Sequence, residues 1–531
     1  MTEKNKTNLQ PHMGWINGHP VLMVDGKPFV MLAGEVHNSS SSSLAYMEKV
    51  WEKADALGMN CLLLPVTWEL TEPEEGRFDF SIVRGLIRQA RTYGKKISFL
   101  WFGAWKNAQC YYAPEWVKKD TGRFRRAQVV KGKNFIRNGD FYDMPYSSLS
   151  YLCGETRRAD ARAFGRLMAY IREVDGEEHT VVSVQVENET GVMGAAREHS
   201  DEANVRFAAP VPQAFVDHMR MAGGEVGAAM EGGSSSGTWT EVFGPLAEEV
   251  FSAYHIARYV NAVAEAGKRE YPIPLTVNCW LDKEEEAGTY PSGGPVAKMM
   301  EVWRYCAPSV DIIGPDIYVP NFPEVCARYA RGDNPLYIPE CAVHGYAGAR
   351  AVLGVGRYHA ACYSPFGFED MGRPLTGSQL ALFGGDASDS ALQTPQDVVA
   401  YGEINRILGG MMTRLTQRYG TAGLQASSAE IEPCASFGMG RYRIDARFTG
   451  RDGVCLVLQE SADSFFLVVQ AAALSFHSAD PALPGLDILR LEEGRFADGV
   501  WYPGRRLNGD EAVLNTYDGP TALFAKLFAY R

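Results

Sequence analysis

The chain has 531 residues, of which 46% are hydrophobic and 22% charged, and its formal net charge is −12. This composition is typical of a soluble globular protein with room for roughly two or three domains. The acidic balance argues against nucleic acids and anionic membranes as partners. The N-terminal residues are polar and no apolar run reaches transmembrane length, so we expect a cytoplasmic protein with reduced cysteines.

Strand-like apolar runs alternate with helical segments over most of the chain. The predicted strands are 29–37, 61–68, 96–105, 180–189, 273–280, 310–319, 335–340 and 360–368. The predicted helices are 43–57, 81–93, 161–173, 246–266, 296–305, 324–330, 349–357 and 398–415. These strand–helix units predict a parallel (β/α)₈ TIM barrel. A doubly wound sheet is the alternative, which the lack of a glycine-rich phosphate loop after a strand disfavours.

Two long insertions, between residues 106 and 160 and between 191 and 243, follow the third and fourth strands. They lie on the catalytic face of a barrel, where we expect them to shape a pocket. From about residue 421 the sequence changes to short alternating runs separated by Gly, Asp and Ser, which predicts a smaller all-β, sandwich-like domain. We therefore predict a barrel over 1–418 and a β domain over 419–531, whose role in docking, oligomerisation or carbohydrate binding stays open.

Two of the predicted strands end in a carboxylate. VVSVQVENE ends at Glu189, and PLYIPE ends at Glu340. Apolar runs of this kind are typical of strands buried on both faces, and barrels carry their chemistry at the C-terminal strand ends. A single acidic residue there is more often a helix cap. Two of them on well-separated strands, one preceded by Asn188, predict the acid/base and nucleophile of a retaining glycosidase.

With the strands placed, a family resemblance becomes visible. LAGEVH, TWELTEPEEGRFDF, VQVENET and IPE follow one another in this order and resemble glycoside hydrolase family 35, chiefly β-galactosidases. The resemblance covers residues 14–410, and the C-terminal β domain resembles the tail of a bacterial subgroup. It implies that Glu189 is the general acid/base, that Glu340 is the nucleophile, and that no metal or organic cofactor is required. The implied substrate is a terminal β-galactoside of an oligosaccharide.

The resemblance also implies positions that bind the sugar. Asn188 would bond the 2-hydroxyl, Tyr318 would bond the nucleophile, and Asn107 and Gln109 stand where the family typically has Asn-Ala-Glu. Glu187 would share a strand face with Glu189 and help to bind hydroxyl groups. Further candidates are Glu35, His37, Trp68, Trp105, Asn278 and Trp280 near strand ends, and Trp239 in the Gly/Ser-rich insertion. A hydrogen-bonded pair is the structural alternative for Glu35 and His37, and core packing is preferred for Trp68.

Departures from the family pattern predict a remodelled sugar pocket. Pro65 replaces an expected Tyr, five serines at 39–43 replace an aromatic-Arg segment, and the eighth strand lacks the usual Trp. A β-galactoside stays the first choice, and β-glucosides, β-glucosaminides and α-L-arabinopyranosides are the alternatives for exo-hydrolysis. The alternative from another class is a catalytically silent carbohydrate-binding barrel. A homo-oligomer is left open.

Overall fold

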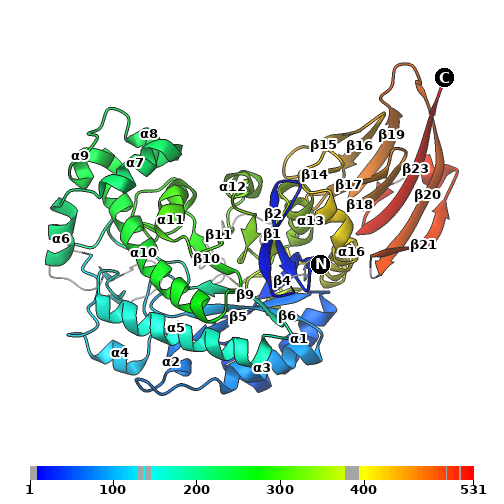
Figure 1. The fold of residues 1–531 in the computed structure, drawn as a ribbon. Coiled ribbons are helices and arrows are strands. Elements are labelled where there is room, and N and C mark those ends of the chain that lie inside the picture. Colours follow the sequence, from blue (N-terminus) through cyan, green and yellow to red (C-terminus); the bar gives the residue numbers. More distant parts are fainter. Residues whose placement is uncertain (1–8, 130–135, 138–144, 377–393, 498, 514–515) are drawn as a thin grey trace, which may run out of the picture.

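The computed structural model describes residues 9–129, 136–137, 145–376, 394–497, 499–513 and 516–531. It begins with an antiparallel sheet that the sequence analysis did not predict. This sheet contains β1 (His12–Ile16), β2 (His19–Val24) and β3 (Lys27–Pro28). In Figure 1 it appears in dark blue in front of the first barrel strand.

Eight parallel strands form the barrel, paired in the order β11-β10-β9-β6-β5-β4-β13-β12. They are β4 (Met31–Glu35), β5 (Cys61–Thr67), β6 (Lys96–Phe102), β9 (Val181–Val186), β10 (Leu275–Trp280), β11 (Ile312–Asp316), β12 (Tyr337–Ile338) and β13 (Cys362–Tyr363). A parallel bridge between Ile317 and Cys341 joins the β11 and β12 ends of the sheet. This closure confirms the predicted barrel, because the ends of a doubly wound sheet stay apart.

The barrel strands were recognisable because almost all of their residues are buried. Every residue of β5 and β9 is buried, as expected for strands covered by helices on one side and packed against the barrel interior on the other. The covering helices are α1 (Leu44–Ala56), α3 (Ser81–Thr92), α5 (Gly154–Asp175), α10 (Ala247–Glu270), α11 (Met300–Cys306), α12 (Phe322–Tyr329), α13 (Ala347–Tyr358) and α16 (Val398–Gln417). In α3 the spacing of the buried Val83, Leu86, Ile87 and Ala90 gives the helix one apolar face.

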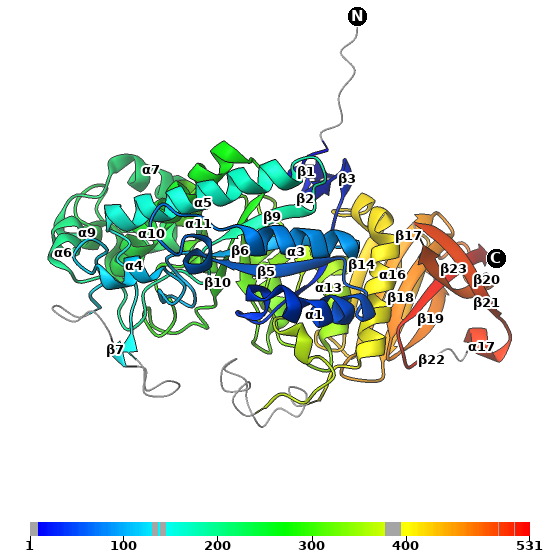
Figure 2. The ribbon, with the colours of Figure 1, turned by 90° about the horizontal axis from the view of Figure 1, so that it is seen from below.

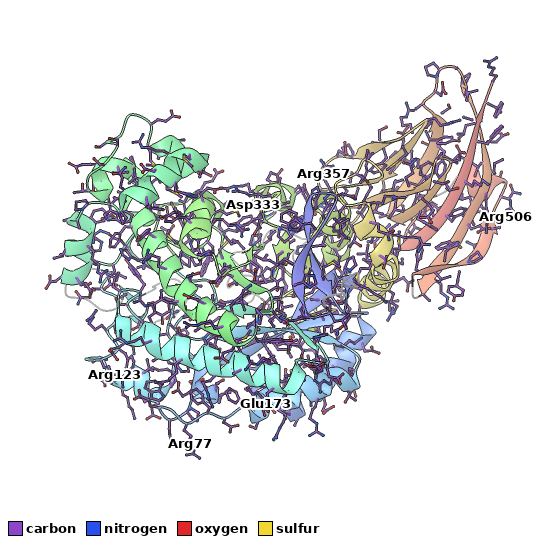
Figure 3. The ribbon with its side chains drawn as sticks, in the orientation of Figure 1. Arg77, Arg123, Glu173, Asp333, Arg357 and Arg506 are labelled. Carbon is purple, nitrogen blue, oxygen red and sulfur yellow. The ribbon has the colours of Figure 1, made fainter. Side chains whose placement is uncertain are left out.

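The insertion after β9 is helical and contains α6 (Asp201–Ala208), α7 (Gln213–Ala222), α8 (Gly224–Ala229) and α9 (Trp239–Phe243). In Figure 1 these helices lie at the far end of the barrel from the C-terminal sheets. The insertion after β6 contains α4 (Glu115–Lys119), β7 (Ile136–Arg137) and β8 (Pro145–Tyr146), and its residues 130–135 and 138–144 lie outside the described part. Charged side chains such as Arg77, Arg123 and Glu173 lie on the outer surface (Figure 3).

The C-terminal part is all-β, as predicted, and consists of two antiparallel sheets with an apolar core between them. One sheet has the order β14-β17-β18-β23-β20-β21, and the other has the order β15-β16-β19-β22. The strands are β14 (Leu424–Ser428), β15 (Cys434–Met439), β16 (Tyr442–Phe448), β17 (Val454–Ser461), β18 (Ser464–Gln470), β19 (Ala472–Ser478), β20 (Gly485–Ala497), β21 (Val500–Leu507), β22 (Thr516–Tyr517) and β23 (Thr521–Tyr530).

The sheets lie beside α13 and α16 of the barrel, as Figure 2 shows from below. A buried ion pair joins the two parts, because Arg350 Nη2 on α13 lies 2.7 Å from Glu430 Oε1 in the segment after β14. Within the described residues, no helix has the length and hydropathy needed to cross a membrane.

Candidate active site

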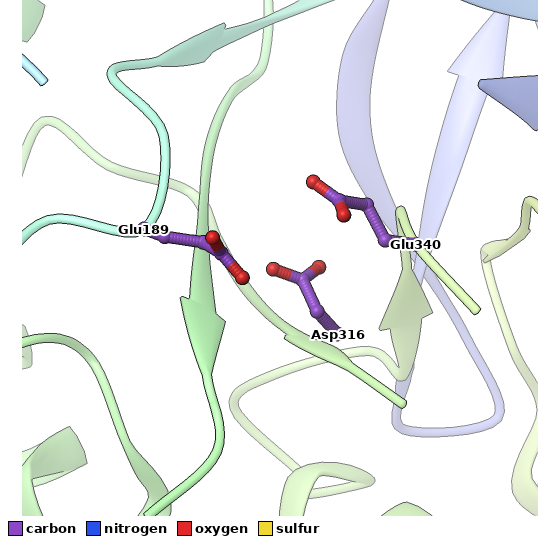
Figure 4. Close-up of side chains that lie close together, drawn as sticks. All are labelled: Glu189, Asp316 and Glu340. Carbon is purple, nitrogen blue, oxygen red and sulfur yellow. The ribbon is translucent and has the colours of Figure 1, made fainter. Parts of the chain in front are cut away.

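Three carboxyl groups meet at the C-terminal end of the barrel strands (Figure 4). Glu189 follows β9, Asp316 ends β11 and Glu340 follows β12. One oxygen of each lies within 4.8 Å of the others, and the three residues are 6%, 3% and 4% exposed. The structure therefore brings the two predicted glutamates together at the strand ends. It adds an aspartate, Asp316, that the sequence analysis did not select.

The carboxylate of Glu340 is surrounded by hydrogen-bond donors. Its Oε1 accepts from Asn188 Nδ2 at 3.1 Å and from Asn278 Nδ2 at 3.4 Å, and its Oε2 accepts from Tyr318 Oη at 2.9 Å. Lys106 Nζ lies 3.8 Å from Oε1. The neighbours of this carboxyl group are thus three hydrogen-bond donors and one ammonium group.

Glu189 has a different environment. Burial raises the pKa of its carboxyl to about 7, and the negative charge of Glu340 acts in the same direction. Lys106 and a hydrogen bond with Asp316 act against this rise. Because its backbone N–H donates to Asn278 Oδ1 at 3.0 Å, Glu189 is fixed next to the strand that carries Asn278. Burial and the adjacent charge thus favour the protonated form of Glu189.

Glu187 does not share the face of Glu189, and this part of the sequence prediction is wrong. Strand β9 ends at Val186, and both Glu187 (φ 63°) and Glu189 (φ 44°) have left-handed backbones, so the alternation of a strand no longer applies. Glu187 Oε2 accepts from the backbone N–H of Trp105 at 2.8 Å, and its carboxyl shares a hydrogen bond with Asp160. Glu187 and Asp160 thus belong to a second buried cluster, separate from Glu189 and Glu340.

The loop after β6 lies against the carboxyl groups. Lys106 Nζ donates to Asn188 Oδ1 at 3.0 Å, and the backbone N–H of Ala108 donates to the carbonyl of Glu189 at 3.0 Å. Asn107 and Ala108 have φ values of 52° and 56°. Left-handed residues other than glycine are strained and gather at functional sites, and here they occur on both facing loops. The backbone N–H of Asn107 lies 3.5 Å from Asn188 Oδ1, so this end of the loop lies beside Asn188.

Glu35 and His37 do not form the pair that was considered for them. His37 Nε2 lies 2.9 Å from Asp370 Oδ2. Glu35 is fully buried, and neither of its carboxyl oxygens has a hydrogen-bond partner among the described residues. Burial raises the pKa of Glu35, and Glu340 adds to this rise. An unpaired buried carboxyl is costly, so Glu35 is available to bind a polar group that enters the site.

Three of the four candidate tryptophans are unsuited to stacking on a sugar, because packing covers their rings. Trp68 is fully buried and donates from Nε1 to Glu72, and Trp105 donates from Nε1 to Ser148. Trp239 packs among Phe215, Phe243, Phe251 and Tyr254 in the helical insertion. Trp280, at the end of β10, stays partly exposed.

The sequence analysis missed Asp316 and Lys106. Asp316 ends an apolar strand and so carries the same signal as Glu189 and Glu340. Lys106 gave no such signal, since a lysine after a strand is usually solvated. The three carboxyl groups lie close enough together to surround a cation. The buried ammonium group of Lys106 is such a cation, and it lies 3.8 Å from Glu340.

Comparison with known proteins agrees with the family named from the sequence. Residues 21–100 match the model "Glycosyl hydrolases family 35", which confirms the resemblance over the first three barrel strands. This match ends before Glu189 and Glu340. Residues 403–516 match a "Domain of unknown function (DUF5597)", which spans most of the C-terminal sheets.

Individual relatives are distant. A β-galactosidase of Xanthomonas manihotis is 28% identical over 170 residues, which are 32% of this chain and 25% of that protein. The β-galactosidase structure of Bacillus circulans sp. alkalophilus has a TM-score of 0.46 and 13% identity, covering 73% of this chain and 57% of that one. The exo-β-1,4-mannosidase Op5Man5 of an Opitutaceae bacterium, strain TAV5, has a TM-score of 0.40 and 14% identity, covering 72% and 60%. The chain thus spans a quarter of the first protein and less than two thirds of the two structures.

Proposed function

We propose that the protein is a retaining, exo-acting β-glycoside hydrolase whose first-choice substrate is a terminal β-D-galactoside. The observation that carries the proposal is the pairing of Glu189 and Glu340, whose oxygens lie within 4.8 Å of one another. Retaining enzymes hold their carboxyl groups about 5–5.5 Å apart, and inverting enzymes about 6.5–9.5 Å apart. The match to glycosyl hydrolases family 35 over residues 21–100 supports the same class of reaction.

The different environments of the two glutamates support different catalytic roles for them. Glu340, ionised among its donors, attacks the anomeric carbon, while Glu189 gives its proton to the departing oxygen. The charge of Glu340 is lost when the glycosyl-enzyme forms, and this lowers the proton affinity of Glu189. Glu189 then removes a proton from the water that attacks the anomeric carbon and releases Glu340.

The site is buried and acidic, which supports the removal of one terminal sugar. Both glutamates are almost completely buried, and Glu35 and Gln109 each present buried oxygens with no hydrogen-bond partner among the described residues. These acceptors suit the hydroxyl groups of a sugar. The substitution of Gln109 for the family's glutamate leaves the identity of that sugar to be tested.

A panel of aryl β- and α-glycosides tests the proposal. The panel contains galactoside, glucoside, glucosaminide, mannoside and arabinopyranoside, and proton NMR follows the anomeric configuration of the first product. We expect hydrolysis of the β-galactoside with net retention. An inverted first product contradicts the mechanism. Binding of galactose without turnover of any member contradicts the enzyme and favours the carbohydrate-binding barrel.

A further inference from the structure

Asp316 is a third carboxyl group in the site, and the two-glutamate mechanism gives it no task. It is 3% exposed and ends β11. Parallel pairing of β10 and β11 places it opposite Trp280, at the same level of the barrel as the two glutamates. Figure 4 shows its carboxyl group between those of Glu189 and Glu340.

Asn278 fixes the position of Asp316. Asn278 Nδ2 donates to Asp316 Oδ2 at 2.7 Å and reaches Glu340 Oε1 at 3.4 Å, while Asn278 Oδ1 accepts from the backbone N–H of Glu189 at 3.0 Å. One amide therefore orients all three acidic residues. The carboxyl groups of Asp316 and Glu189 have oxygens within 4.8 Å of each other, and Asp316 Oδ1 is buried with no hydrogen-bond partner among the described residues.

A hydrogen bond between two carboxyl groups requires a proton on one of them. The ionisable groups that face Asp316 are Glu189 from the loop after β9, Cys279 on β10, Tyr318 after β11, Glu340 after β12, Glu35 on β4 and Lys106 after β6. Burial keeps Cys279 a neutral thiol and Tyr318 a neutral phenol. Lys106 thus provides one positive charge for four carboxyl groups, and it lies next to Glu340 and Asn188.

We propose that Asp316 is a positioning residue that stays protonated and donates a hydrogen bond to Glu189 whenever Glu189 is ionised. This inference rests on the proposed role of Glu189 as acid/base. Burial and the adjacent charges of Glu340 and Glu189 raise the pKa of Asp316 well above its ordinary value, which agrees with a neutral carboxyl group. A neutral carboxylic acid in a buried site is an effective donor to a developing negative charge.

The protons balance over both steps. In the first step Glu189 gives its proton to the glycosidic oxygen, the bond from that oxygen to the anomeric carbon breaks, and Glu340 bonds to the carbon. Asp316 keeps its proton and donates to the new carboxylate of Glu189. In the second step Glu189 takes a proton from water, the water oxygen bonds to the carbon, and the bond to Glu340 breaks. Glu189 and Asp316 then both carry a proton again.

The pH profiles of two variants distinguish a neutral Asp316 from an ionised Asp316. Asp316→Asn keeps an acceptor for Asn278 and a donor for Glu189. We expect its kcat/KM on an activated aryl galactoside to stay within about tenfold of wild type and the alkaline limb of its pH profile to stay in place. Asp316→Leu removes the donor. Its alkaline limb should move up by about one pH unit, because ionised Glu189 loses a hydrogen bond.

Other positions of the alkaline limb in these two variants overturn the proposal. If Asp316→Asn moves the alkaline limb to lower pH by about one unit or more, Asp316 was ionised in the wild type, because removing a nearby negative charge makes Glu189 a stronger acid. An unchanged limb in folded Asp316→Leu shows that the contact has no effect. Asp160→Asn is the matched control. Asp160 is a buried carboxyl group of the second cluster that accepts from Trp101 Nε1 at 2.8 Å, and this variant should leave the limbs in place.

An infrared measurement tests the proton itself and requires no turnover. The difference spectrum of wild type minus Asp316→Asn at neutral pH should contain the C=O stretch of a protonated carboxylic acid. A carboxylate band in its place overturns the proposal. Since this spectrum does not depend on any substrate, a protein that hydrolyses no glycoside refutes the proposed function without deciding the state of Asp316.

Discussion

Lys106 Nζ lies 3.8 Å from Glu340 Oε1, and the two side chains are 4% and 5% exposed. A buried carboxylate needs a partner charge, and burial strengthens the attraction between the two. Lys106 also donates to Asn188 Oδ1, while Asn188 donates to Glu340, so these three side chains form one continuous network. Several properties of the protein should depend on it.

Lys106→Met should move the alkaline limb of the pH–rate profile to higher pH, because Glu189 loses a positive charge that lowers its pKa. Glu340 loses its nearest cation at the same time. We expect a shift of about one unit and a loss of roughly 10- to 100-fold in kcat near pH 7. Lys118→Met is the control, since Lys118 pairs with the partly exposed Glu69 at 3.3 Å. An unmoved alkaline limb in Lys106→Met contradicts the role of this charge.

Glu340→Gln should abolish turnover while the protein stays folded, because the amide keeps the shape of the side chain but is not a nucleophile. Added azide should then replace it and give the glycosyl azide of inverted configuration. Product NMR and circular dichroism together check this outcome. Full activity in a preparation free of wild-type enzyme would refute the assignment.

Glu189→Ala should slow substrates with poor leaving groups far more than activated aryl glycosides, because only the former need a proton on the departing oxygen. With activated substrates the glycosyl-enzyme should accumulate, and azide should release it with retained configuration. Glu187→Ala is the comparison, since Glu187 faces Trp105 and Asp160. If Glu187→Ala shows this pattern and Glu189→Ala does not, the acid/base is Glu187.

Gln109→Ala should reduce kcat/KM for the β-galactoside by roughly 10- to 1,000-fold, because a buried polar contact with the matched sugar is lost. A glycoside that differs at one hydroxyl should lose less. Gln109→Glu should retain more activity than the alanine variant, since it restores an acceptor. Equal and small losses for every sugar would place Gln109 outside the sugar pocket.

Glu189→Gln should stabilise the protein at alkaline pH. The pKa of Glu189 is raised from 4.5 to about 7, so the stability that its protonated form provides is lost as the pH rises through this range. The glutamine variant does not titrate and avoids a penalty of up to roughly 3 kcal/mol. Urea unfolding of the wild type and of Glu189→Gln at about pH 5 and about pH 8 measures this difference in the free energy of unfolding. A gain that is equal at both pH values would show that Glu189 is not the cause.

The fold could be predicted because its signals are local. Each barrel strand is an apolar run, and each covering helix has an apolar face, as in α3. Helix α5 begins at Gly154, before the predicted start at 161, because its first turns are polar. The short β1–β3 sheet was missed although Asn17-Gly18 and Asp25-Gly26 at its two turns are hairpin-turn pairs with positive φ.

The candidate site was predicted in part. Strand ends brought Glu189 and Glu340 together, but the direction of a side chain after a strand depends on backbone angles, as the left-handed Glu187 shows. Trp239 resembled a loop aromatic, and its burial depends on packing against Phe215 of α7 and Phe251 of α10. The neighbours of Lys106 come from four strands, so their arrangement becomes visible only in the closed barrel.

The hydrogen bond that closes the barrel uses the peptide of Glu340 itself, since the backbone N–H of Ile317 donates to the carbonyl oxygen of Glu340 at 2.9 Å. A chain divided between α12 and β12 would therefore yield two pieces, one with Glu189 and one with Glu340. Under the proposed function, neither piece reacts alone, and reassembly of the two pieces restores both the closed ring and the pair of glutamates. Hydrolysis of a coloured β-galactoside is then expected to report the association of two proteins fused to the halves.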